Sequence, residues 1–343
     1  MALPATPEPG ASCPDLRVLA AEHPWLAALA GTPVDDGETD VLDHTRLVAE
    51  QLLRSPQWRR MEPEDRGELW LATLLHDAGK PATTRYERGR WTAPGHARHG
   101  AIIARRVLWE AGLSPFARER ICGLVRHHMA PYRLIDSEHA TRRTIEISLE
   151  AGVRRQHLLS RSDALARSDD LTTDVDLFAV HAEELGCLER PYPFASDHAR
   201  FTYFTHPSRD PAYAAHDDTR SRVVVLSGLP GAGKDQWIAR HHQGRPTIAV
   251  DDRERARTYL REGKPFIWNA THHSRELRAS TISLLADYRA HVTIVAVEAR
   301  PHELRRHNQE RRRPVPWEAV ERVLDDWEAP SITECHRLEV WSG

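Results

Sequence analysis

The most specific chemical pattern in the sequence is Gly-x-x-x-x-Gly-Lys, which runs from Gly228 to Lys234. An apolar, β-branched run at 223–226 precedes it, and a segment around Trp237 that can start a helix follows it. A strand, a glycine loop and a helix in this order direct backbone N–H groups and the lysine ammonium at the phosphates of a nucleotide. The pattern predicts a nucleotide-binding loop, with a flexible glycine turn as the alternative. The residues expected to bind the nucleotide are Gly228, Gly231, Ala232, Gly233, Lys234 and Asp235.

A second set of candidates consists of histidines and aspartates in the first 170 residues. The pair His76-Asp77 ends a nearly apolar segment that begins at Leu69, so the carboxylate is predicted to be buried. A buried carboxylate needs a cation partner, and a bound metal ion is the natural one. Histidine nitrogens and carboxylate oxygens suit Mn, Fe, Co, Ni or Zn, and one carboxylate can bridge two ions. Further candidates on helical patterns are His44, His96, His99, His127, His128 and Asp163. The chain has 21 histidines, so a single match is weak, and a lone histidine is more often a surface or core residue.

Polar residues also follow the apolar runs of the C-terminal part. Strands are predicted at 247–250, 265–269 and 292–297, with helical patterns between them, which indicates a small parallel sheet. Chemistry in such sheets occurs at the carboxyl ends of the strands. There, Asp252 can take a proton from an attacking hydroxyl and Arg255 can hold the neighbouring phosphate. Asp251 is the fallback for the base, and a solvated acidic turn is the alternative.

A basic helical segment with an abrupt stop occupies 304–316. In a phosphoryl-transfer enzyme it can form a lid whose arginines meet the transferred phosphate. The arginines expected to do so are Arg305, Arg311 and Arg312. The alternative is an exposed cationic helix face.

Length and composition limit the remaining possibilities. A chain of 343 residues exceeds the size at which a single core keeps growing, so two domains are expected. The longest apolar runs, 69–75 and 223–226, are too short to span a bilayer, and the four cysteines form no Cys-x-x-Cys pair. We therefore expect a soluble, cytoplasmic protein with no membrane partner.

Charge argues against a polybasic surface. The first 220 residues hold 27 basic and 33 acidic side chains, and the remainder holds 20 and 17. A protein that follows many phosphates along a nucleic acid needs more positive charge, whereas one that grips a strand end needs only a few arginines. Only three cations are lysines, Lys80, Lys234 and Lys264, and two of these lie inside motifs. Such retention suggests that a compact ammonium is needed there.

The predicted domains are 1–190, 191–220 and 221–343. Helices are expected from Val41 to about Ser55 and, beginning after residues 62–65, up to Lys80. The second range is rich in aromatic residues and is expected to be an ordered connector, since a disordered linker holds few of them. The fold class is thus multidomain, an all-α helical bundle followed by an α/β domain with a parallel sheet.

The order His44, His76-Asp77, Asp163 resembles that of the HD-domain phosphohydrolases. The strings His-Asp-Ala-Gly-Lys-Pro-Ala-Thr-Thr, Gly-His-x-x-x-Gly and Val-Arg-His-His-Met-x-Pro resemble the branch found with RNA-processing enzymes. The resemblance implies a first metal ion on His44, His76, Asp77 and Asp163. It implies a second ion on His96 and His128, with Asp77 between the two and with His99 or His127 as substitutes. Lys80 would meet the substrate phosphate.

The C-terminal part resembles the phage-type 5′-hydroxyl polynucleotide kinases. The shared strings are Gly-Leu-Pro-Gly-Ala-Gly-Lys, Asp-x-x-Arg, Asn-Ala-Thr, the arginine segment that ends in Val-Pro, and 327–334. The chain departs from that pattern at Asp235, which stands where the family has Ser or Thr. A carboxylate can bind Mg²⁺ directly or through water, so the mode of metal binding is the open question.

An HD domain followed by such a kinase resembles the bacterial HD–polynucleotide kinase fusions, which are RNA end-healing enzymes. The resemblance covers about 40–343 and implies that the HD domain removes 2′,3′-cyclic, 2′ or 3′ phosphates while the kinase phosphorylates 5′-hydroxyl ends. Expected cofactors are ATP or another NTP with Mg²⁺ and one or two transition metals of the kinds named above. Expected partners are RNA ends, with DNA ends as the alternative, and an RNA ligase acting downstream. The alternatives are an HD nucleotidase joined to a small-molecule kinase, and an HD enzyme regulated by an ATP-sensing loop.

Overall fold

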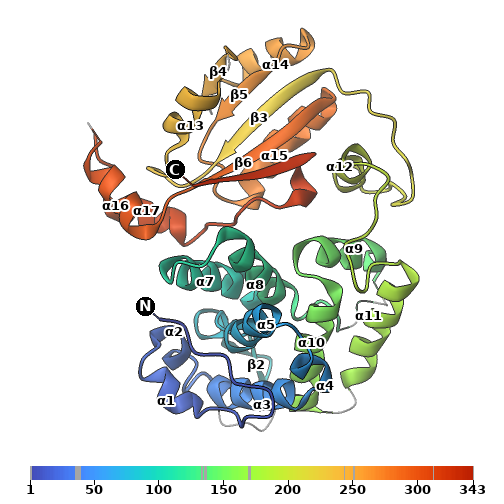
Figure 1. Ribbon diagram of the computed structural model, residues 1–343, viewed down its shortest axis with the longest axis vertical. Helices are drawn as coiled ribbons and strands as arrows, with labels where there is room; N and C mark the ends of the chain where they lie inside the picture. Colours follow the sequence, from blue (N-terminus) through green and yellow to red (C-terminus); the bar gives the residue numbers. More distant parts are fainter. Residues whose placement is uncertain are drawn as a thin grey trace. The chain divides into compact units, whose positions relative to one another are not determined.

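The computed structural model describes residues 2–34, 40–132, 134, 137–168, 171–242, 244–249, 252–311 and 313–342. The chain divides into two compact units, Met1–Pro193 and Phe194–Gly343 (Figure 1). The first is almost entirely helical and the second is an α/β unit. The predicted fold class, an all-α bundle followed by an α/β domain, is confirmed.

The first unit is a helical bundle with one small hairpin. Its helices are α1 (Leu16–Ala20), α2 (Pro24–Ala27), α3 (Val41–Arg54), α4 (Pro56–Arg59), α5 (Pro63–Leu75), α6 (Lys80–Thr83), α7 (His96–Glu110), α8 (Pro115–His127), α9 (Ala140–Glu150), α10 (Val153–Arg167) and α11 (Thr172–Glu184). Strands β1 (Arg85–Glu87) and β2 (Arg90–Thr92) pair antiparallel between α6 and α7.

Helices α3, α5 and α10 pack against one another, and α7 packs along α8. Helix α5 is buried from Glu68 to Leu75, as its apolar sequence predicts. Asp40 caps α3 by accepting a hydrogen bond from the Asp43 amide, and the helix ends at Arg54 before Pro56, where the sequence predicts its end. The C-terminal end of α5 therefore lies inside the bundle.

Helix α5 ends earlier than the sequence predicts. It stops at Leu75, and two tight turns follow, with Ala78 N–H donating to the Leu75 carbonyl and Lys80 N–H to that of Asp77. The prediction of a helix up to Lys80 is therefore wrong. The close approach of α7 explains the turn, because a Cβ on Gly79 would lie 2.1 Å from the His96 carbonyl oxygen and 2.6 Å from the Gly100 nitrogen.

The second unit is built on a five-stranded sheet in the order β4-β5-β3-β6-β7, in which every neighbouring pair is parallel (Figure 1). The strands are β3 (Ser221–Ser227), β4 (Thr247–Ala249), β5 (Phe266–Asn269), β6 (Ala290–Glu298) and β7 (Arg337–Ser342). The helical elements are α12 (Asp197–Thr205), α13 (Lys234–His241), α14 (Arg253–Arg261), α15 (Arg275–Asp287), α16 (Pro301–Gln309), α17 (Trp317–Leu324) and the 3-10 turn η2 (Ile332–Glu334).

The predicted parallel sheet is confirmed, with one strand more than expected. Strand β7 pairs with β6 at the edge of the sheet and is only partly buried, so its sequence has no continuous apolar run to reveal it. The predicted strand at 247–250 includes Val250, which lies outside the described residues; the strand they contain is β4.

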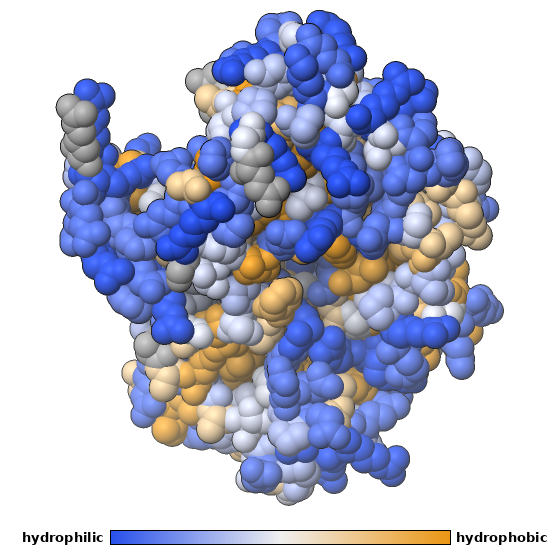
Figure 2. Space-filling model, turned by 45° about the horizontal axis from the view of Figure 1, so that its top comes forward, coloured by the Kyte–Doolittle hydropathy of each residue, from blue (hydrophilic) through white to orange (hydrophobic). Residues whose placement is uncertain are grey.

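The range 191–220, expected to be an ordered connector, contains helix α12, which was not predicted and belongs to the second unit. Ser196 caps it by accepting from the Ala199 amide, and Arg200 donates to the carbonyl of His336 beside β7. No helix of the described residues is long and apolar enough to cross a membrane. On the face shown in Figure 2, hydrophilic side chains cover most of the surface.

The close approach at Gly79 yields a stability prediction. We expect Gly79→Ala to lower the free energy of unfolding by about 2 kcal/mol or more, because the backbone atoms it would meet cannot move aside as side chains do. Urea unfolding measures this. Gly67→Ala inside α5 is the matched control: its Cβ meets only the Thr6 hydroxyl, and we expect a change within about 1 kcal/mol. A Gly79→Ala protein as stable as the parent would contradict the packing described here.

Candidate functional site

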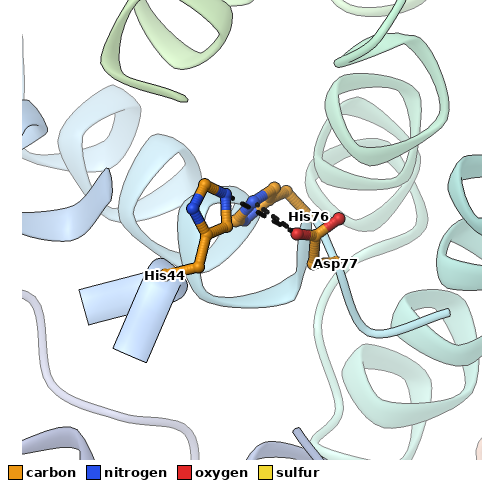
Figure 3. Close-up of side chains that lie close together, drawn as sticks. All are labelled: His44, His76 and Asp77. Atoms are coloured by element: carbon orange, nitrogen blue, oxygen red, sulfur yellow. Dashed lines mark ion pairs between the residues drawn. The ribbon is translucent and has the colours of Figure 1, made fainter. Parts of the chain in front are cut away.

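The centre of the helical unit holds a group of buried side chains from three helices. His44 lies in the first turns of α3, His76 is the C-cap of α5, and Asp77 follows it. Figure 3 shows both imidazoles directed at the Asp77 carboxylate. Asp77 Oδ2 lies 3.7 Å from His44 Nε2 and 3.2 Å from His76 Nε2, and all three side chains are at most 1% exposed.

Asp163 completes this side of the centre from α10. Its Oδ1 lies 2.9 Å from His44 Nε2 and 4.0 Å from His76 Nε2. Residues that are 119 positions apart in the chain thus meet because α3 and α10 pack together. The structure brings together the four residues predicted as the first ligand set.

The other oxygen of Asp77 faces a second pair of histidines. Its Oδ1 lies 3.4 Å from His96 Nε2, at the start of α7, and 3.7 Å from His128 Nε2, at the end of α8. Two ligand groups therefore share Asp77, one of His44, His76 and Asp77 and one of Asp77, His96 and His128. The shared carboxylate has the arrangement needed to bridge two cations.

Backbone hydrogen bonds fix which nitrogen of each ring faces the centre. The Nδ1 atoms of His76, His96 and His128 lie 2.7–2.8 Å from the carbonyl oxygens of residues three positions earlier. A carbonyl only accepts, so each Nδ1 carries the proton and each Nε2 presents a lone pair. The Nε2 atoms of His96 and His128 face each other at 3.2 Å, so two lone pairs meet unless a cation lies between them.

The donor set fits divalent metal ions. Asp77 Oδ2 pairs with Lys80 Nζ at 2.7 Å, but Asp77 Oδ1 and His76 Nε2 have no hydrogen-bond partner among the described residues, although both are buried. Such atoms are costly unless a ligand satisfies them. Burial lowers the pKa of His128 to about 3, with neighbouring His96 and His76 contributing, so this imidazole stays neutral as a ligand must. Burial alone would raise the pKa of Asp77, but Lys80 and His76 outweigh it and keep the carboxylate charged.

The two proposed substitutes lie elsewhere. His127 is buried, but its Nε2 lies 2.9 Å from Glu150 Oε2, and His99 belongs to neither ligand group. Neighbouring residues on a helix point about 100° apart, so His127 and His128 cannot both face one point. Of the adjacent histidines, the structure brings His128 to Asp77.

Three further groups surround the carboxylates. Lys80 Nζ lies 2.7 Å from Asp77 Oδ2, so in this structure the lysine predicted to meet substrate phosphate pairs with the carboxylate. Arg167 Nε donates to Asp163 Oδ1 at 3.1 Å, and the Tyr132 hydroxyl donates to Oδ2 at 2.9 Å. Sequence reasoning missed both. The i, i+4 spacing to Asp163 could have indicated Arg167, whereas nothing in the sequence singled out Tyr132.

In the α/β unit the glycine loop joins β3 to α13, as predicted. A Cβ on Gly228 would lie 2.3 Å from the Val297 carbonyl oxygen, and Gly231 and Gly233 have φ values of +90° and +105°. These three positions therefore require glycine. Ala232 is buried between them, and its N–H donates to the Leu229 carbonyl.

Lys234 is the first residue of α13, and its ammonium donates to the carbonyls of Gly228 (2.7 Å) and Leu229 (3.0 Å). Burial lowers its pKa to about 8. Next to it, Asp235 Oδ1 accepts from Asn269 Nδ2 at 3.2 Å. This contact joins the glycine loop to the carboxyl end of β5, where the sequence analysis expected chemistry.

Asp252 is the N-cap of α14 and accepts from the backbone amide of Arg255 at 3.2 Å. The Arg255 guanidinium is exposed and donates to the Tyr259 hydroxyl and not to the Asp252 carboxylate. Asp251, the fallback base, lies outside the described residues. In this structure the Asp-x-x-Arg segment forms the N-terminal cap of α14, with the Asp252 carboxylate as the capping group.

The predicted lid corresponds to α16 and the turn after it. Arg305 lies over the Trp317 ring, 4.6 Å from its centroid. Arg311 is near enough to Lys234 that its positive charge helps to lower the pKa of that lysine. Arg312 lies outside the described residues. His307, which the sequence analysis did not single out, has Nδ1 3.2 Å from the Gly231 carbonyl oxygen and ties α16 to the glycine loop.

Comparison with known families finds one matching family in each of the two units. Residues 41–168 match the HD domain family, and residues 251–330, beyond the glycine loop, match an AAA domain family. The chain is an HD domain followed by a P-loop kinase-like domain. The candidate metal ligands, from His44 on α3 to Asp163 on α10, all lie within the range that matches the HD domain family.

Two curated proteins are similar to parts of the chain. A CC-adding tRNA nucleotidyltransferase of Thermus thermophilus is 42% identical over 113 residues, or 32% of this chain and 24% of that protein. A bifunctional uridylyltransferase/uridylyl-removing enzyme of Bradyrhizobium diazoefficiens is 32% identical over 100 residues, or 29% of this chain and 10% of that protein. The chain thus spans about a quarter and a tenth of the lengths of these relatives.

The two-sided arrangement around Asp77 predicts separable metal binding. We expect His128→Ala to lose about one bound metal ion per chain, because it removes one of the two histidines that face Oδ1. Metal content after dialysis against Mn²⁺, measured by mass spectrometry, tests this. His127→Gln changes the neighbouring buried histidine and should keep the parent's content. Equal loss in both variants, or full content in His128→Ala, would contradict the assignment.

Proposed function

We propose that the protein heals broken RNA ends with two active sites in one chain. Its HD domain would remove a 2′,3′-cyclic, 2′ or 3′ phosphate, and its P-loop domain would phosphorylate the 5′-hydroxyl from an NTP. The observation that carries the proposal is that one chain combines a shared-carboxylate histidine centre with a glycine loop that leads into a helix beginning at Lys234. Strand breakage leaves two ends that cannot be joined, and each of these chemistries repairs one.

In the HD domain, His44, His76, Asp77 and Asp163 would hold one divalent ion, and Asp77, His96 and His128 a second. Such ions activate water for attack on a phosphate. The chain's own part is to hold the ligands rigidly: helix backbone carbonyls orient the rings, and Arg167 and Tyr132 hold Asp163. Lys80, 2.7 Å from Asp77, is near enough to the centre to meet a substrate phosphate once ions neutralise that carboxylate.

In the P-loop domain, the glycine loop would receive the phosphates of the NTP, and Lys234 would turn from the loop carbonyls to the β- and γ-phosphates. Asp235, held by Asn269, would take the place of the usual hydroxyl in holding Mg²⁺ directly or through water, and the ion would supply positive charge to the phosphates. Asp252 would accept the proton of the attacking 5′-hydroxyl, and Arg255 and Arg311 would hold the phosphate in transfer.

One comparison supports RNA as the substrate, and two further points concern the recognition and joining of strand ends. One similar protein is by name a tRNA nucleotidyltransferase. The chain lacks the excess positive charge that binding along a nucleic acid requires, which favours recognition of ends. Both products, a free 3′ hydroxyl and a 5′ phosphate, are groups that a ligase joins, so we expect an RNA ligase to act next; DNA ends are the alternative substrate.

The shared position of Asp77 predicts loss of hydrolysis. We expect Asp77→Ala to abolish phosphate release from an oligoribonucleotide with a 2′,3′-cyclic phosphate end, and EDTA to do the same to the parent. Asp43→Ala is the control, because Asp43 also lies in the helical unit but pairs with Arg17 at the surface. Full activity of Asp77→Ala would overturn the metal centre, whereas loss in both variants would indicate a folding defect.

The separation of the two sites predicts independent losses. Lys234→Ala should lower 5′ phosphorylation about a hundredfold or more, because the loop loses the charge that compensates the transferred phosphoryl group. Its phosphate release should stay within about twofold of the parent, since distant sites act nearly additively. Lys264→Ala, an exposed lysine paired with Glu262 in the same unit, should leave both activities unchanged. If ATP strongly alters hydrolysis in the parent and not in Lys234→Ala, the loop is a regulatory sensor instead.

A further inference from the structure

A pocket of about 280 Å³ opens beside the metal centre of the HD domain. Two of its lining residues, Lys80 and His96, also contact Asp77. A molecule bound in the pocket would therefore lie next to the candidate metal-binding residues. The volume is near the lower end of the range for ligand sites, which suits one small group such as a nucleoside and excludes a folded segment of RNA.

The charged side chains among the described residues of the lining are cationic. The lining includes Lys80, Arg90 and Arg167, and none of the described residues in it is acidic. Lys80 and Arg167 pair with the carboxylates of the centre, whereas Arg90 forms no ion pair with any residue that the structure describes. A ligand that carries negative charge at one end is therefore favoured.

An aromatic side chain forms another wall. Trp91 of β2 lines the pocket and is 39% exposed, and Met129 lies on the lining as well. The ring of Tyr86, directly across the hairpin, meets that of Trp91 at 5.1 Å in an edge-to-face arrangement. The Trp91 ring thus contacts Tyr86, and 39% of the residue stays exposed.

The hairpin that carries Trp91 has a defined geometry. Its turn residues Arg88 and Gly89 have φ values of +52° and +82°, the left-handed pair expected of a two-residue turn that matches the twist of the strands. The register then pairs Tyr86 with Trp91, and the chain continues through Ala93, whose carbonyl oxygen lies 2.7 Å from His96 Nδ1. The aromatic wall and a candidate metal ligand are consequently only five residues apart on one ordered segment.

We infer that this pocket is a nucleoside subsite in which Trp91 stacks on the base of the nucleotide that carries the scissile phosphate. The inference rests on the proposed function, since it names what the HD site recognises beside the phosphate. Bases at single-stranded ends are unstacked and free to lie on an aromatic ring, and stacking tolerates all four bases because each has a π face. The subsite therefore gives the enzyme a preference for nucleotide ends over other phosphates, without selecting a sequence.

The test compares two substrates of the metal-loaded protein. One is an oligoribonucleotide with a 2′,3′-cyclic phosphate on an ordinary terminal nucleoside, and the other is the same oligonucleotide with an abasic terminal ribose. Trp91→Ala should lower kcat/KM for the first by about ten- to a hundredfold, the usual effect of losing one base–aromatic stack. It should leave the abasic substrate unchanged, and Trp91→Phe should retain most of the parent's preference.

Phe116→Ala is the matched control, because Phe116 is an exposed aromatic side chain of the same unit, 66% exposed, and does not line the pocket. It should leave both substrates unaffected. The inference is overturned if the parent uses both substrates equally well, or if Trp91→Ala slows both by the same factor, which would mean that the residue only supports the hairpin.

A binding measurement separates failure of this inference from failure of the proposed function. Equilibrium dialysis of a nucleoside 2′-monophosphate and of ribose 5-phosphate is performed in the Lys234→Ala background, so that the glycine loop contributes equally throughout. Trp91→Ala should weaken nucleotide binding about tenfold and leave ribose 5-phosphate unchanged. If no RNA end is hydrolysed but this difference persists, the proposed reaction is wrong and the subsite stands; if the difference is absent, the subsite is wrong.

Discussion

The burial of Asp77 is the constraint on which the helical unit depends. A carboxylate that is fully buried at the end of an apolar helix must be balanced by positive charge, and the helices around it supply ring nitrogens that cannot do so while neutral. Lys80 compensates part of this charge. The remaining buried atoms, Asp77 Oδ1 and His76 Nε2, have no hydrogen-bond partner among the described residues, so a cation at the centre would satisfy them.

Backbone packing sets the geometry of that centre. The turn at 76–79 can bring Asp77 against the start of α7 only because Gly79 has no side chain, since the His96 carbonyl occupies the space that a Cβ would need. The rings of His76, His96 and His128 are then oriented by carbonyls within their own chain segments. The positions of these three rings are thus set at helix ends, and a small error in helix packing would separate them.

In the α/β unit, close backbone packing and a side-chain hydrogen bond position the glycine loop. Gly228 lets β3 approach β6 at the point where the loop begins, and Asn269 ties Asp235 to the end of β5. The loop faces the carboxyl ends of parallel strands, where backbone N–H groups and the start of α13 favour an anion. The Lys234 ammonium lies in this space and donates to the loop carbonyls, so a positive charge is already present where phosphates would bind.

The resemblance to the HD-domain phosphohydrolases predicted the residues that meet around Asp77. The local patterns of the sequence determined the class of each unit, the extent of α3 and the strands of the sheet other than β7. Local signals carry such information: apolar periodicity, a proline after a helix, and glycines at fixed spacing. Only the tertiary structure decided the early end of α5, the choice of His128 over His127, the partners Tyr132 and Arg167, and the pocket with Trp91. These depend on which segments approach one another in space, and a single sequence contains no local pattern for contacts between residues far apart in the chain.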